Sequence, residues 1–248
     1  MEDFWNTLIQ QFNSTFIVDN RWEWFLRGLG YTLLISFFSV ILGLTIGTVL
    51  ALGRLSSKKV LRGISMVYID VIRGTPTMVQ LLLIYFVVFA SVNIPKWIVG
   101  VIAFGINSGA YMAEIVRGGI LSIPKGQTEA GLSLGMTRSQ TMKYIVLPQA
   151  IKNILPAMGN EFIVLIKETA VMGMIANIDL VGAAKKVQSL TFDYLMPLLA
   201  IAVIYYAVVK LLSVLLGVFE AKLRKSDLHG ATKRHSRKAA LRNGRLDG

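Results

Sequence analysis

Three polar residues share one helical face within a long apolar stretch, roughly residues 98 to 120. Asn107, Tyr111 and Glu114 are spaced i, i+4 and i+7, which places them on the same side of a helix. A second carboxylate, Glu161, lies in another partly apolar stretch. An ionisable group inside a membrane costs at least about 2.5 kcal/mol, so it usually faces a cavity or the interior of a helix bundle. These residues therefore predict a polar site within the membrane.

Both carboxylates also have a purely structural interpretation. Glu114 and Arg117 are three residues apart, so they can pair with each other near the cytoplasmic edge of their helix. Glu161 can be a structural partner of Lys152 or Lys167. The sequence leaves these alternatives open.

The chain offers few residues for catalysis or metal binding. It contains no cysteine, and its two histidines, His229 and His235, lie in the C-terminal tail. The remaining acid–base candidates are the same carboxylates, Asp70 and lysines, which makes a membrane enzyme the weakest hypothesis. The phosphate-binding pattern G-x-x-x-x-G-K-[ST] does not occur, so any ATP chemistry linked to this protein would have to come from another chain. We expect no catalytic residue, metal site or cofactor in this chain.

The composition indicates a membrane protein. Of 248 residues, 54% are hydrophobic and 16% are charged, against roughly 25% charged in soluble domains, and the mean hydropathy is +0.60. The net charge of +12 is concentrated in short loops and the tail. Because no aromatic residues are interleaved with the tail's charges, we expect contact with anionic lipid and none with nucleic acid.

The apolar stretches predict an all-α protein with five transmembrane helices. Phe4, Leu8 and Phe12 recur every fourth residue, so residues 1–27 are expected to form an amphipathic segment at the membrane surface. A proline at position 76, between Thr75 and Thr77, should break the helix there. The predicted crossings are residues 28–52, 78–92, 98–120, 150–174 and 195–219, the fourth as a broken helix.

Charge then sets the orientation. The acidic N-terminal segment belongs outside, and the basic 54–62 loop belongs inside. Five crossings put the strongly basic tail, residues 221–248, in the cytoplasm, whereas four would put it outside. Residues 28–220 form the membrane domain in this scheme, and residues 179–194 form an outer loop.

The polar stretch from 121 to 147 should face the cytoplasm as two short helices. Gly135 can end the first helix in a left-handed cap. Thr137 and Gln140 fit a capping box at the start of the second. Pro148 marks its expected end.

This stretch carries a recognisable signature. The pattern EAA-x3-G-x9-I-x-LP of the membrane subunits of ABC transporters has seven fixed positions, and this stretch resembles it. Six positions match, Glu129, Ala130, Gly135, Ile145, Leu147 and Pro148, and Gly131 stands in place of the second alanine. Further segments resemble the polar amino acid uptake branch of that family: residues 72–80, 107–114, 124–127, 159–162 and 167–169. The resemblance covers about residues 25 to 225.

The resemblance implies a subunit of an ATP-driven importer in a bacterial cell membrane. Such a subunit pairs with a second permease subunit, as a homodimer or heterodimer, and receives an amino acid from an extracellular solute-binding protein. ABC ATPase subunits, which bind ATP and Mg, would dock on the helices at 121–147 through Glu129, Ala130, Gly131 and Gly135.

The implied substrate-binding residues combine a carboxylate for the ammonium group with amides and hydroxyls for the carboxylate of an amino acid. They are Asn107, Glu161, Thr75, Thr77, Tyr111 and Glu114. The alternative is an ion-coupled secondary carrier that works alone, but the sequence shows no inverted repeat.

Overall fold

The computed structural model describes the backbone of residues 1–176 and 178–243, and their side chains except those of Glu2 and residues 224–243. Every regular element in this part of the chain is helical. The α-helices are α1 Glu2–Phe12, α2 Trp22–Leu55, α3 Lys59–Arg73, α4 Thr77–Leu83, α5 Lys96–Leu121, α6 Lys125–Ser133, α7 Arg138–Thr141, α8 Leu147–Glu168, α9 Leu180–Thr191 and α10 Leu195–Asn243.

Shorter π and 3-10 segments extend some of these helices. The π segments are Asn13–Ile17, Ile84–Val88 and Met142–Val146, and the 3-10 segments are Val18–Asn20 and Thr169–Met174.

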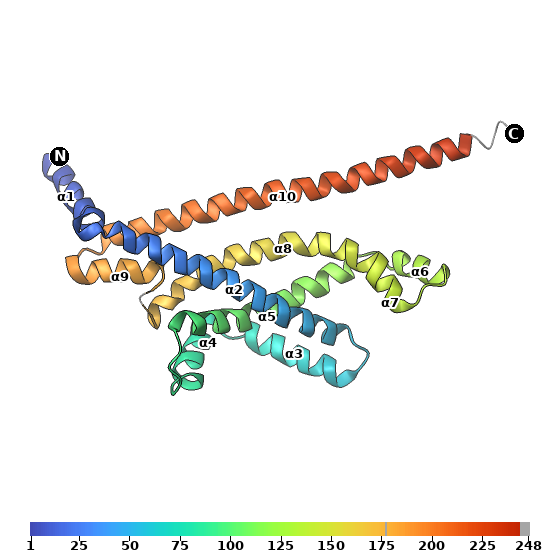
Figure 1. Cartoon of the computed structure of the whole chain (residues 1–248), viewed down its shortest axis with the longest axis horizontal. Coiled ribbons are helices and arrows are strands. Elements are labelled where there is room, and N and C mark those ends of the chain that lie inside the picture. The colour runs from blue at the N-terminus through green and yellow to red at the C-terminus, as the bar shows by residue number, and fades with distance from the viewer. Residues whose placement is uncertain (177, 244–248) are drawn as a thin grey trace.

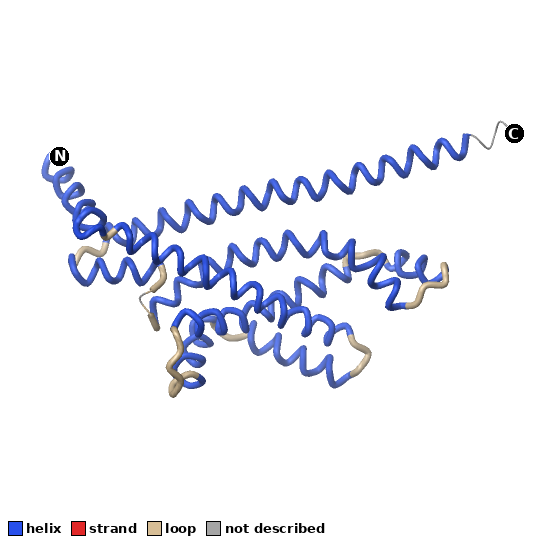
Figure 2. Tube along the Cα trace, in the orientation of Figure 1, coloured by secondary structure: helices blue, strands red, loops and turns tan. Residues whose placement is uncertain are grey.

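The long helices run back and forth along one axis (Figure 1). The N-terminus, α9 and the start of α10 lie at one end of the molecule. The α2–α3 turn, α6, α7 and the far end of α10 lie at the other (Figure 2). The basic 54–62 loop and the polar 121–147 stretch therefore share one end, as the charge pattern predicts.

Small residues allow α2 and α5 to pack closely. A Cβ atom on Gly47 would lie 2.5 Å from Met112 Cβ and 2.7 Å from the Ala113 backbone nitrogen. Gly43 approaches Ser108 in the same way, at 2.9 Å. The G-x-x-x-G spacing thus serves packing within this subunit. Larger apolar side chains complete the main core: Ile35, Leu81, Phe104, Leu165 and Met172.

Three described helical segments are long and apolar enough to cross a membrane: Trp22–Leu55, Lys96–Leu121 and Leu195–Leu223. The pair of α3 with the segment Thr77–Val88, bent by 103°, would make a fourth crossing. This bend confirms the predicted break at Pro76, whose backbone is extended. The more polar α8 falls outside this set, so the count of five crossings stays a prediction.

One local expectation is wrong. The region predicted as an outer loop contains the helix α9, because Asp179 caps its first turn by accepting hydrogen bonds from the backbone N–H groups of Val181 and Gly182. Its small face, including Ala183 and Ala184, is buried. In the fourth predicted crossing, residues 150–174, α8 continues through Pro156 and changes to a 3-10 helix at Thr169.

Candidate functional site

A polar network crosses the middle of the bundle where α3 breaks into α4. The Ile72 carbonyl has no helical partner at this break, because the residue four positions later is Pro76, which has no N–H. Gln80 donates hydrogen bonds from Nε2 to the Ile72 carbonyl at 2.7 Å and to the Thr75 hydroxyl at 2.7 Å. Asn107 on α5 donates from Nδ2 to Gln80 Oε1 at 2.9 Å and is only 1% exposed. The network therefore ties the broken segment to α5.

Glu161 meets the next residue of α5. Ser108 donates from its hydroxyl to Glu161 Oε1 at 3.0 Å, and Glu161 is 8% exposed. The structure thus pairs Glu161 with a hydroxyl rather than with Lys167, one of the structural partners considered from the sequence. Two adjacent residues of α5 therefore bond to two different helices, Asn107 to Gln80 of α4 and Ser108 to Glu161 of α8.

The other predicted residues lie further along α5 and α4. Tyr111 lies beside Arg73, whose guanidinium carbon is 5.2 Å from the ring centroid. Glu114 accepts a hydrogen bond from Arg117 at 2.6 Å and forms an ion pair with Arg54 at 3.5 Å. The structural alternative for Glu114 is therefore the arrangement observed.

Thr75 and Thr77 flank the break itself. Thr75 is exposed and bonded to Gln80, and Thr77 is the half-buried first residue of α4. The six predicted residues thus form two groups, one at the polar network and one at the arginines near the end of α5.

Gln80 and Ser108 were not among the predicted site residues. Both fall inside segments that carry the family resemblance, and Gln80 is the one amide between residues 78 and 90. A single amide within this apolar stretch was the signal in the sequence that could have indicated a buried polar role for Gln80. The partners of Gln80 depend on which helices face each other, which spacing within one helix does not reveal.

The polar unit formed by α6 and α7 has the predicted local chemistry. Gly135 has φ +80°, which confirms the left-handed cap. Thr137 and Gln140 form the predicted capping box, with hydrogen bonds of 2.8 and 3.2 Å. Glu129 and Ala130 are exposed, and Leu134 is 82% exposed. The unit thus presents apolar and acidic groups on its surface.

The predicted helix end at Pro148 is wrong. The π segment Met142–Val146 leads directly into α8, with Pro148 in its first turn, where the missing N–H of proline has no required partner. Gln149 donates from Nε2 to the Ile145 carbonyl at 2.7 Å. The helical path from Arg138 to Glu168 is therefore uninterrupted.

These features define a class of protein: a helical membrane permease with a polar unit at one end and a buried polar network. The chain belongs to the family described as the inner membrane component of binding-protein-dependent transport systems, whose sequence model matches residues 43–225. This confirms the family expected from the signature and places the protein in the inner membrane as a multi-pass component.

Similar proteins agree with this assignment. A crystal structure of an amino acid ABC transporter with histidines has a chain 46% identical, with a TM-score of 0.76, covering 81% of this chain and 94% of that one. GlnP of Rickettsia typhi, described as a glutamine transport permease, is 42% identical over 80% of this chain and 92% of its own. The arginine transport permease ArtQ of Bacillus subtilis is 40% identical over 82% and 93%.

Proposed function

We propose that this chain is the membrane subunit of an ATP-driven importer for polar amino acids. The relatives named for amino acid transport support the substrate class. The observation that carries the proposal is the pair of neighbouring residues on α5, Asn107 and Ser108, which join the broken α3–α4 segment to the buried carboxylate of Glu161. No feature favours the secondary carrier.

In this proposal, Glu161 accepts the ammonium group of the substrate. A buried carboxylate that accepts a hydrogen bond from a neutral hydroxyl still favours a cation nearby. Asn107 and Thr77 supply donors for the substrate carboxylate, since broken helices direct such groups toward a midmembrane site. Thr75, whose hydroxyl donates to the Val71 carbonyl at 2.9 Å and accepts from Gln80, holds the break that positions them. Tyr111 and Glu114 line the path beyond it, next to arginines that neutralise Glu114.

The unit formed by α6 and α7 docks on ABC ATPase subunits, which bind ATP and Mg. Glu129 and Ala130 make direct contact because they are exposed, while Gly131 and Gly135 give the unit its shape. Two permease subunits, identical or different, form the path. The docking end, the 54–62 loop and the tail at 221–248 face the cytoplasm, and the amphipathic segment 1–27 faces outward with the solute-binding protein.

The test is a complex purified with its ATPase and reconstituted in vesicles, screened for amino acids whose uptake requires ATP. Glu161→Gln should lower uptake at least about tenfold without changing assembly, because it removes the charge that holds the ammonium group. Lys167→Gln on the same helix, an exposed residue, is the control and should leave uptake near wild type. Full uptake by Glu161→Gln would refute its role in the site. Uptake that persists without ATP or ATPase would refute the importer.

A further inference from the structure

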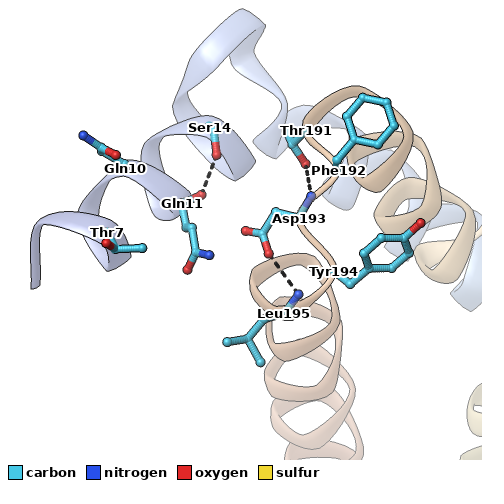
Figure 3. A pocket seen from close by; sticks show the side chains of 9 residues that line it. All are labelled: Thr7, Gln10, Gln11, Ser14, Thr191, Phe192, Asp193, Tyr194 and Leu195. Atoms are coloured by element: carbon cyan, nitrogen blue, oxygen red, sulfur yellow. Dashed lines mark hydrogen bonds between the residues drawn. The ribbon is translucent and has the colours of Figure 1, made fainter. Parts of the chain in front are cut away.

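The residues of one polar groove lie on α1, the π segment after it and the turn from α9 to α10. These elements lie at the end of the molecule that carries the N-terminus, opposite α6 and α7 (Figure 1). The groove lies between α1 and the turn from α9 to α10, and its volume is about 570 Å³, within the range of roughly 300–1,000 Å³ typical of binding pockets. Its polar walls, drawn in Figure 3, are formed by Thr7, Gln10, Gln11, Ser14, Thr191 and Asp193.

One carboxylate in this groove has an oxygen without a partner. Asp193 accepts hydrogen bonds through Oδ1 from the backbone N–H groups of Leu195 and Met196, and so caps α10. Its Oδ2 atom is buried and has no hydrogen-bond partner. Figure 3 shows this side chain directed toward the α1 wall. A buried carboxylate oxygen without a donor is costly and favours a cation.

No cation of the chain itself fills this role within the described residues. None of the residues lining the groove is basic. Arg21, which contacts the wall from outside, donates to the Ser14 carbonyl at 2.6 Å and pairs with Asp19 at 3.4 Å. The Nε atom of Arg21 is buried and has no hydrogen-bond partner, so Arg21 forms no hydrogen bond to Asp193 and the acceptor in the groove stays unpaired.

The rim of the groove presents two aromatic side chains. Phe192 has φ +55°, a left-handed conformation that bulky residues rarely adopt, and its side chain is 83% exposed. Tyr194, on the other side of Asp193, is 64% exposed. Aromatic residues flanking a buried charge are typical of contact points at protein interfaces.

We propose that this groove is a docking site for the solute-binding protein, which inserts a lysine or arginine side chain toward Asp193 while Phe192 and Tyr194 pack on the surrounding surface. This inference rests on the proposed function, which supplies the partner and puts this end outside. Charge complementarity selects the occupant, since the groove offers an unpaired acceptor and several neutral acceptors but no basic group.

The experiment uses the complete complex in lipid nanodiscs and the solute-binding protein that stimulates ATP hydrolysis by the wild type. Asp193→Asn removes the charge but keeps the helix cap, because asparagine caps as well as aspartate. We expect the concentration of binding protein for half-maximal stimulation to rise at least about fivefold, with unchanged hydrolysis in its absence. Gln11→Lys, which supplies a competing cation from the opposite wall, should act in the same direction.

Asp3→Asn is the matched control, because it makes the same chemical change on α1 outside the groove. It should leave stimulation at the wild-type level. Wild-type stimulation by both Asp193→Asn and Gln11→Lys would overturn the docking site and leave the importer intact. If Asp3→Asn weakens stimulation as much as Asp193→Asn does, the effect comes from general surface charge and the docking site is refuted. A loss that appears without binding protein and changes with the lipid headgroup would overturn it in favour of a lipid. If no solute-binding protein stimulates ATP hydrolysis by the wild-type complex, both the proposed importer function and its docking site are refuted.

Discussion

Gly131 sets the distance between α6 and the helix that follows. A Cβ atom at this position would lie 2.8 Å from Thr141 Cγ2, 2.9 Å from Thr141 Oγ1 and 2.9 Å from Ile145 Cδ1. The end of the Ile145 side chain can move, but Thr141 is buried and its hydroxyl donates to the Thr137 carbonyl at 3.0 Å. Gly131→Ala therefore has to push α6 away from α7.

Two opposing effects set the free-energy cost of Gly131→Ala. Alanine inside a helix is more favourable than glycine by about 1 kcal/mol. Overpacking a closely packed contact costs typically about 1–3 kcal/mol. With Thr141 held on both sides, we place the overpacking at about 2 kcal/mol, which leaves a net cost of about 1 kcal/mol. If this cost applies to the arrangement in which α6 and α7 dock on the ATPase, coupled ATP hydrolysis should decrease about fivefold.

The assay is ATP hydrolysis by the reconstituted complex, with and without binding protein. Gly126→Ala is the control on the same helix, where a Cβ atom would meet nothing within 4 Å, and it should be neutral. Gly131→Ala combined with Thr141→Ala removes the two contacted Thr141 atoms and leaves only the movable end of Ile145, so it should recover most of the loss. Full coupling by Gly131→Ala alone, or no recovery in the double variant, would refute this account of the packing.

Three further predictions concern folding. Gly47→Ala should greatly reduce the yield of folded protein, because its Cβ would meet α5 backbone at 2.7 Å, whereas Gly30→Ala, with open space around it, should express normally on a size-exclusion profile. Thr137→Ala should cost about 1 kcal/mol through loss of the capping box, and Thr137→Ser should not, as measured by protease resistance of α7. Burial raises the pKa of Asp179, which lies outside the membrane-spanning helices, from 3.8 to about 6. The folded state therefore binds the proton more tightly, so stability should increase as the pH falls from 7 to 5. Asp179→Asn, which keeps the cap, should flatten this dependence of the thermal midpoint, and an equal slope in both proteins would contradict it.

Features encoded by neighbouring residues could be predicted from the sequence. The left-handed Gly135, the capping box at Thr137 and the break at Pro76 each depend on the conformational limits of one or two residues. The charge pattern also predicted that the 54–62 loop and the 121–147 unit lie at the same end of the molecule. The basic loop belongs on the cytoplasmic side, and the chain crosses outward and back again before it reaches residue 121.

Features that depend on tertiary contacts could not be predicted. α9 is short and carries two adjacent lysines, and it is stabilised by burial against α2, where a Cβ on Gly28 would lie 2.7 Å from the Asp179 carbonyl. Lys186 stacks over Trp24, with its Nζ atom 3.6 Å from the ring centroid. The hydrogen bonds of Gln80 likewise require α4 to face α5, and no spacing within one helix reports that.

The uninterrupted helical path from Arg138 to Glu168 has a mechanical consequence. From Thr141, which contacts α6, to the buried Glu161 the path covers about 20 residues, or roughly 30 Å at about 1.5 Å per residue. The run contains no loop, although the π segment Met142–Val146 and Pro148 are points at which a helix bends most readily. A tilt of about 10° of the run as one body would displace the far end by about 5 Å, more than the length of a hydrogen bond. A small rotation of a partner can therefore open or close the contact between Glu161 and Ser108, with no loop in between to absorb it.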